Sequence, residues 1–254
     1  MALSANREVD HYIDQELRSL QVASAANIYK GALVGLKSDG YARPLTAGDP
    51  FVGIAYEEMD NTTGDDGDVS VRVYTMGDFG HTLSGATIAD TGRPVFASAD
   101  DTLTFFGDGN SYVGVVEDFV SAGEVIVRLD TAGSRVKTIT HAVEDLAAGA
   151  DISARAIHGF TSSAWIAGAR VVNQATAAAG IDDSNTCVVT LKIGALTVVT
   201  ETFDSTTTFP GVNEQQSLGA ASNTHAAKDD EITLEVTNGT NANPGPFIIE
   251  VDYV

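Results

Sequence analysis

The sequence predicts an all-β protein with two domains. Three observations support this prediction: a unit of about sixty residues occurs twice, its matched parts are short runs of apolar and β-branched residues, and turn-forming residues separate those runs. The length of 254 residues also exceeds the roughly 100–150 residues of a typical domain. We therefore expect an extended arm, then a pseudo-duplicated β domain, then a C-terminal antiparallel β-sandwich of the jelly-roll type.

Residues 1–24 are expected to form the N-terminal arm. Val9, Ile13 and Leu17 recur at helical spacing, whereas residues 20–22 have the character of a strand opening. We expect an extended arm with room for one helical turn.

Residues 25–133 carry the repeat and are expected to form the duplicated β domain. The matched segments share apolar residues at the same places, and they are residues 31–34 with 92–95, 51–55 with 112–116, and 69–73 with 125–129. The first two pairs have the same offset and the third has a smaller one, because the second copy has a shorter turn before its last strand. Asp-Gly turn signals at residues 39–40, 66–67 and 108–109 favour hairpins.

Residues 136–254 are expected to form the sandwich. The chain becomes rich in Ala, Thr, Asn and Ser after the Gly-Ser step at residues 131–134, which we take as the domain boundary. The candidate strands are residues 135–141, 165–173, 186–192, 196–203, 231–236 and 247–253. Several of them alternate apolar with polar residues, which is typical of an antiparallel sheet with one face in the core.

The charge of the chain excludes several partners. It carries 35 acidic and 14 Lys or Arg residues, a formal net charge of −21. Binding to phosphates needs a cluster of Lys and Arg, and the sequence has none, so we expect no direct contact with nucleic acid.

The sequence also lacks the roughly 18 continuous apolar residues of a membrane span, so no membrane partner is expected. The first residues do not resemble a signal peptide, and we expect the protein to be made and used without secretion.

No constellation of residues predicts an enzyme, a cofactor or a metal site. Residues 31–38 have the wrong glycine spacing for a phosphate-binding loop, and a turn follows them instead of a helix. The acidic residues 60–68 lack the glutamate of a calcium loop, so a solvated hairpin loop is favoured over weak cation binding. The five histidines show no metal-ligand spacing, and no serine lies in a nucleophile elbow. The single cysteine, Cys187, lies in an apolar run and is expected to be buried.

Trp165 is the only tryptophan. It opens an apolar strand, so the sandwich core is the favoured position for its ring, and a sugar-binding face is the alternative.

An ordered set of segments resembles the capsid cement, or head decoration, family of tailed phages and prophages. The segments are residues 1–9, 26–34, 40–42, 51–55, 60–62 and 67–73, which follow the order and approximate spacing of that family. The resemblance covers about residues 1–130. The C-terminal domain is only loosely similar to accessory β-sandwiches of phage head proteins.

This resemblance implies a structural virion protein that binds the outer surface of the capsid and stabilises it. The implied partners are the major capsid protein and the chain itself, as a homotrimer made in the cytoplasm of the bacterial host. The family has no catalytic residues, and its arm lies on capsid subunits, so we expect Arg7, Tyr12 and Arg18 to contact the capsid. The alternatives are an adhesion module that binds host glycans through Trp165 and, with less support, a polysaccharide-degrading virion enzyme.

Overall fold

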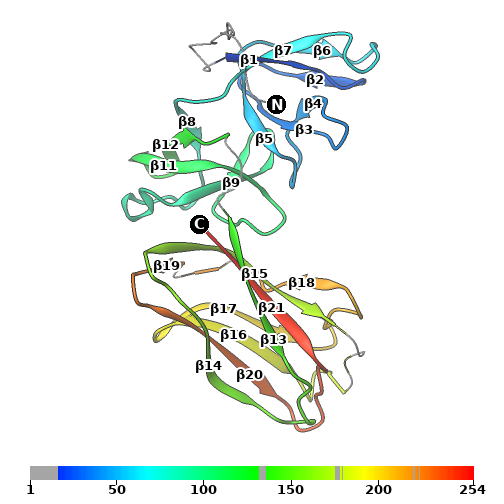
Figure 1. Cartoon of the computed structure of the whole chain (residues 1–254), viewed down its shortest axis with the longest axis vertical. Helices are drawn as coiled ribbons and strands as arrows, with labels where there is room; N and C mark the ends of the chain where they lie inside the picture. The colour runs from blue at the N-terminus through cyan, green and yellow to red at the C-terminus, as the bar shows by residue number, and fades with distance from the viewer. Residues whose placement is uncertain (1–16, 132–135, 175–177, 179, 220, 223) are drawn as a thin grey trace, which may run out of the picture.

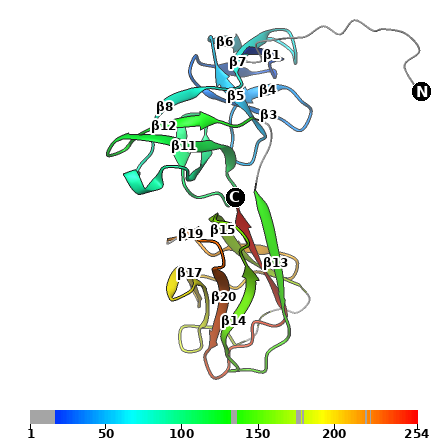
Figure 2. The same ribbon diagram turned by 60° about the vertical axis from the view of Figure 1, so that its left-hand side comes forward.

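The computed structural model describes residues 17–131, 136–174, 178, 180–219, 221–222 and 224–254. Antiparallel strands dominate these residues, and the helical element among them is a single 3-10 turn, η1 (Ile88–Asp90). The predicted all-β class is therefore confirmed. The repeat-containing half lies above the C-terminal sandwich along the long axis of the molecule (Figures 1 and 2).

Two five-stranded sheets form the first half, and their strand orders are equivalent. The first sheet has the order β1 (Leu17–Gln21), β7 (Ser70–Tyr74), β5 (Phe51–Ala55), β3 (Leu33–Leu36) and β4 (Ala42–Pro44). The second has the order β8 (Asp78–Thr82), β12 (Glu124–Leu129), β11 (Ser111–Ser121), β9 (Pro94–Ala99) and β10 (Thr102–Thr104). Each strand of one sheet thus has a counterpart at the same place in the other. A short pair, β2 (Ala26–Ile28) with β6 (Met59–Asn61), belongs to the first unit alone.

The strand registers confirm the offset of the first two matched segments. In the first sheet Leu33 pairs with Ile54, and in the second Pro94 pairs with Val115, so both partners are displaced along the chain by that same offset. A register shift also occurs at the same place in both pairs of strands. One unit of structure has therefore been used twice, down to the irregularity in its sheet.

The last strand of the unit corrects the predicted alignment. Leu20 on β1 pairs with Val71, and His81, its counterpart on β8, pairs with Val125. Val71 and Val125 are therefore equivalent, whereas the sequence match aligned Val71 with Val127. A strand slipped by two positions keeps the same side chains on the same face, so the apolar pattern fits both registers equally well.

The last residues of the predicted arm belong to the first sheet. Residues 17–21 form an edge strand of the first sheet, and Val22 makes a further bridge to Ala42. The expected arm over residues 1–24 is thus wrong for residues 17–22, which belong to the first repeat unit. Residues 1–16 lie outside the described part of the chain.

The two sheets and the sandwich are stacked in sequence. The core of the first unit lies between its sheet and the β2–β6 pair. The core of the second unit is closed by the reverse face of the first sheet, through Leu33, Phe51 and Ile54. Tyr112, the counterpart of Phe51, packs against Ala167 of the sandwich in the same way. The same face of each unit therefore contacts the next module along the chain.

The C-terminal half is a jelly roll. One sheet has the order β13 (Lys137–Val143), β21 (Phe247–Tyr253), β15 (Ala164–Asn173) and β18 (Gln215–Ser217), and the other has β14 (Ile152–Gly159), β20 (Glu231–Asn238), β16 (Cys187–Ile193) and β17 (Leu196–Phe203). The first of these eight strands thus pairs with the last, the second with the seventh, the third with the sixth and the fourth with the fifth. This nested pairing defines the predicted jelly roll. The pairing of β19 (His225–Ala226) with the start of β15 is additional.

A single core lies between the two sheets of the jelly roll. It includes Phe160, Ile166, Phe203 and Phe247, all of them buried. Cys187 is also buried there, and burial raises the pKa of its thiol to about 12. The expectation of a buried cysteine is therefore confirmed.

His81 makes the second core sensitive to pH. It occupies the position of Leu20 in the first unit, and its Nε2 is buried without a partner among the described residues. Burial lowers its pKa below the ordinary value of 6.5. The unfolded chain therefore binds a proton more readily than the folded one, and stability is lost as pH falls through the ordinary pKa.

We predict that His81→Leu, which copies the first unit, stabilises the protein by about 1 kcal/mol because it removes an unsatisfied buried group. Urea unfolding at neutral pH measures the gain in stability, and urea unfolding at about pH 5, below the ordinary histidine pKa, measures the loss on acidification. The variant should also lose less stability on acidification than the wild type. An equal loss in both proteins would contradict the role of His81.

Candidate functional surfaces

An ion-pair network joins the two halves of the chain. Arg170 on β15 donates hydrogen bonds to Glu250 and Asp252 on β21, both of 2.7 Å, and lies 3.4 Å from Asp108 of the second repeat unit. The side chain of Arg170 is only 18% exposed. Charges this poorly solvated interact more strongly than charges in water. The network therefore holds the jelly roll in one orientation on the repeat domain.

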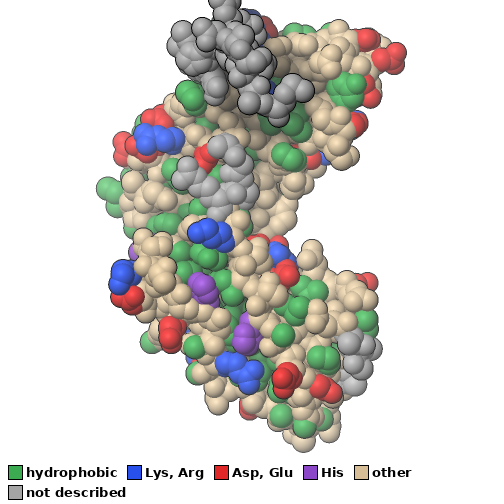
Figure 3. Space-filling view, in the orientation of Figure 1, with side chains coloured by type: hydrophobic (Ala, Val, Ile, Leu, Met, Phe, Trp, Pro, Cys, Tyr) green, Lys and Arg blue, Asp and Glu red, His purple; other side chains and the backbone are tan. Residues whose placement is uncertain are grey.

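Close backbone contact supports this junction. The Gly107 amide donates to the Ala167 carbonyl oxygen over 2.8 Å, and a Cβ built on Gly168 would lie 2.9 Å from the Cβ of Asp108. On one side the junction is hollowed (Figure 3), and this depression of about 590 Å³ is lined by both halves, including Tyr112 and Asp252. A backbone hydrogen bond and close packing therefore join the two halves directly at this junction.

The residues predicted to contact the capsid are described only in part. Arg7 and Tyr12 lie outside the described residues. Arg18 is exposed on the edge strand β1, where its backbone pairs with Val73. Arg18 therefore projects from the first sheet next to the point where residues 1–16 join it.

Trp165 does not occupy the predicted core. Its ring is partly exposed and lies in an open hollow of about 630 Å³ that also includes Thr224 and Leu196. The His225 ring lies 4.7 Å from the indole, between ring centroids, and the guanidinium carbon of Arg93 lies 5.7 Å from its centroid. Arg93 belongs to the second repeat unit, so Trp165 packs at the junction between the halves. His225 and Arg93 cover part of the Trp165 ring, whereas the adhesion alternative expects an open ring face for stacking on a sugar.

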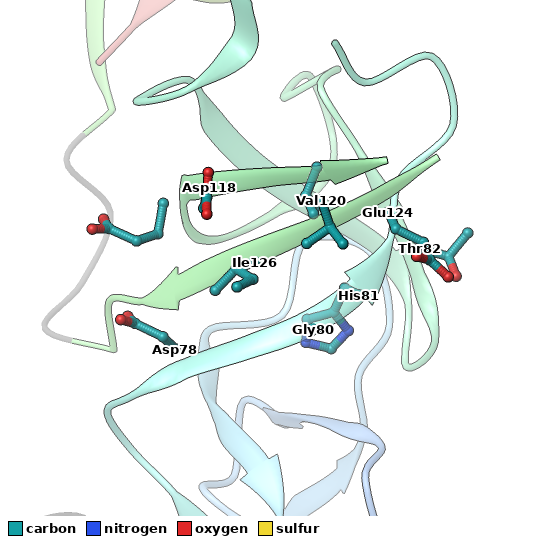
Figure 4. Close-up of a pocket in the computed structure, with 10 residues that line it drawn as sticks. Asp78, Gly80, His81, Thr82, Asp118, Val120, Glu124 and Ile126 are labelled. Atoms are coloured by element: carbon teal, nitrogen blue, oxygen red, sulfur yellow. The ribbon is translucent and has the colours of Figure 1, made fainter. Parts of the chain in front are cut away.

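A second hollow, of about 740 Å³, lies on the exposed face of the second sheet (Figure 4). Gly80 and Ile126 line it together with the half-exposed Val120. The acidic side chains of its lining are Asp78, Glu117, Asp118 and Glu124. Arg128 pairs with Asp78 at 3.0 Å and with Glu117 at 2.7 Å. The hollow is therefore an open acidic depression on a sheet face.

A third surface was missed by sequence reasoning. Lys137 and His141 on β13, with Arg155 and His158 on β14, gather where the edge strands of the two jelly-roll sheets meet, and we call these four residues the edge cluster. Figure 3 shows Lys or Arg and His side chains together on this face of the lower half. The four residues are far apart in the sequence, so the sequence does not reveal that they form a cluster. The presence of Lys137 and Arg155 in strands of a strongly acidic chain could have indicated it.

The carboxylates of the acidic loop at residues 60–68 accept hydrogen bonds from nearby backbone amides. In the acidic loop, Asp66 accepts a hydrogen bond from the Ser24 amide and Asp68 from the Asp65 amide, so these carboxylates stabilise the turn. Within the described ranges, no three His, Cys, Asp or Glu side chains are grouped to hold a metal ion. The helical content described includes no helix long and apolar enough to span a membrane.

Comparison with known proteins does not identify a family. No protein-family profile and no curated protein matches the chain. Among solved structures, infectious bursal disease virus of the Gx strain aligns at 13% identity and a TM-score of 0.27, over 93% of this chain and 71% of that one. The VP2 subviral particle of that virus aligns at 11% identity and a TM-score of 0.25, over 93% and 76% of the two chains. TM-scores this low carry no argument, so the jelly-roll assignment rests on the strand order.

Proposed function

We propose that the chain is a structural virion protein that binds the outer surface of a tailed-phage capsid and stabilises it. The observation that carries the proposal is that the segments resembling the cement family lie on the strands of one folded unit. The resembling residues 26–34, 51–55 and 67–73 contain β2 and β5 and overlap β3 and β7 of the first repeat unit. The resemblance thus concerns the framework of a folded unit and not a scatter of surface residues. The jelly roll of the second half suits the proposal, since viral capsid and lectin domains both use it.

The proposed mechanism is thermodynamic linkage. A protein that binds only the assembled shell adds its binding free energy to the assembled state, and the shell then resists disassembly. The ion pairs at the junction favour such bridging, because halves held in one orientation lose less flexibility on binding. As a homotrimer, the protein would hold the major capsid protein through three sets of contacts that act together.

Deleting residues 1–16 is the sharpest test of the arm. The cut falls before β1, so the sheet keeps its edge strand and the variant should fold as the full chain does. We expect its occupancy on purified heads that lack this protein to fall at least about tenfold, since avidity multiplies the loss of each arm. Sedimentation of heads with bound protein measures occupancy. Unchanged occupancy would refute the role of the arm, including Arg7 and Tyr12.

Quantitative mass spectrometry of the virus particle tests the function as a whole. We expect the protein on the head at a copy number comparable with that of the capsid protein. A few copies located at the tail would favour the adhesion alternative. The enzyme alternative has less support, because Asp78 and Glu117 of the acidic hollow are both paired with Arg128.

A further inference from the structure

We propose that the edge cluster of the jelly roll binds an acidic polysaccharide. The cluster is separate from the arm and from the repeat units, so this inference goes beyond capsid binding.

Strand pairing shows that the side chains of the edge cluster lie on the core-facing side of β13 and β14. Arg155 pairs with Leu234 and His158 with Ile232, and both partners are buried in the core, so cross-strand neighbours place Arg155 and His158 on the inner face. His141 alternates with the buried Ile139 and Val143, so it also lies on the inner face. An edge of a sandwich is normally closed by apolar side chains at these positions. Here basic side chains share this edge with the partly buried Ile157.

Tyr253 connects the upper part of the cluster. The Nζ atom of Lys137 lies 5.8 Å from the centroid of the Tyr253 ring, and the His158 ring lies 5.8 Å from the same centroid. At the lower end, burial and the nearby charge of Arg155 both lower the pKa of the His141 imidazole. The cluster therefore extends along the strands, with basic groups at both ends and an aromatic ring at one.

Among the described residues, no carboxylate pairs with the cations of the cluster. In the described part of the jelly roll, Lys192 pairs with Glu235 and Lys228 with Asp229, whereas Arg170 belongs to the junction network. Lys137 and Arg155 form no ion pair with a described residue, and the Nε2 of His141 is buried without a partner. In a chain with a net charge of −21, two unpaired cations beside two imidazoles form a local site for an anion.

The chemistry favours a polysaccharide over a nucleic acid. Nucleic acids carry a phosphate about every 3.4 Å along each strand and bind through dense cationic patches, whereas here the basic groups are few and the rest of the chain repels phosphates. A sugar polymer with one carboxylate per ring presents sparser charge. Its rings also have apolar faces that pack on an aromatic side chain such as Tyr253.

Binding of polygalacturonate oligomers measured by isothermal titration calorimetry at low salt tests the proposal. We expect the wild type to bind these oligomers and not neutral dextran, with an affinity that falls as salt is raised. The double variant Lys137→Gln and Arg155→Gln should bind at least about tenfold more weakly, since two charge pairs are lost. Both side chains are exposed, so the fold is expected to survive.

The matched control is the double variant Lys192→Gln and Lys228→Gln, which removes the same charge elsewhere on the jelly roll and should bind as the wild type does. Inward-pointing basic residues also protect sheet edges from aggregation. If that is their only role, the wild type will not bind polygalacturonate. Equal weakening by both double variants, or tighter binding of single-stranded DNA, would also overturn the proposal. None of these outcomes affects the occupancy measured on heads.

Discussion

Replacing Arg170 with methionine should destabilise the protein by about 3 kcal/mol, because it leaves Asp108, Glu250 and Asp252 close together without their cation. The arginine is 18% exposed and Asp252 is 13% exposed, so water screens the remaining charges poorly. Urea unfolding followed by the fluorescence of Trp165 measures the loss. This residue is the only tryptophan and lies at the same junction, so it reports on the contact between the halves.

Two further variants separate the ion network from simple loss of packing. Lys228→Met breaks the pair with Asp229, whose side chains are 67% and 75% exposed, and should change stability by less than about 1 kcal/mol. Adding Glu250→Gln and Asp252→Asn to Arg170→Met should restore much of the lost stability, because the carboxylates no longer repel each other. If the triple variant is as unstable as Arg170→Met alone, packing and not charge accounts for the effect.

Gly114→Ala should cost about 3 kcal/mol, at the upper end of the overpacking range, since the added methyl group meets backbone and not a movable side chain. A Cβ on Gly114 would lie 2.0 Å from the carbonyl oxygen of Arg128. Gly53 is its counterpart in the first unit, and a Cβ there would lie 2.1 Å from the carbonyl oxygen of Tyr74. The close approach is therefore a property of the repeated unit, and thermal unfolding should show a lowered Tm for either alanine variant.

Gly80→Ala is the matched control on the same sheet. A Cβ at Gly80 meets no atom within 4 Å, and its backbone is not in the left-handed region. Alanine there should leave stability unchanged or raise it by up to about 1 kcal/mol, since it reduces the freedom of the unfolded chain. A Gly114→Ala protein as stable as Gly80→Ala would contradict the geometry described for β11 and β12.

The sequence predicted the repeat because each unit repeats local signals. Apolar residues 31–34 and 92–95 recur at the offset that the strand registers confirm, and the glycines at positions 53 and 114 recur with them. The predicted strands over residues 196–203 and 247–253 coincide with β17 and β21. These features depend on residues near each other in the chain, so they can be predicted without the fold.

Strand β14 was missed for a reason connected with the edge cluster. Arg155 and His158 share its inner face with Ile152 and Ile157, and two register shifts interrupt its pairing with β20. The apolar alternation that reveals the other strands is therefore absent from residues 152–159. Polar residues on the inner face therefore prevented the sequence from predicting both the strand and the candidate site on it.

By itself, the sequence determined the β class and the duplication, since alternation and turn residues are local properties, whereas the nested strand pairing of the jelly roll is known only from the tertiary structure. The tertiary structure alone decided the register of β7 and β12, because a slip of two positions leaves every side chain on its own face. It also decided that Trp165 lies at the junction and that Arg170 meets Asp108, which is distant from it in the chain. Such contacts depend on how whole sheets pack, and no local pattern in the chain encodes that packing.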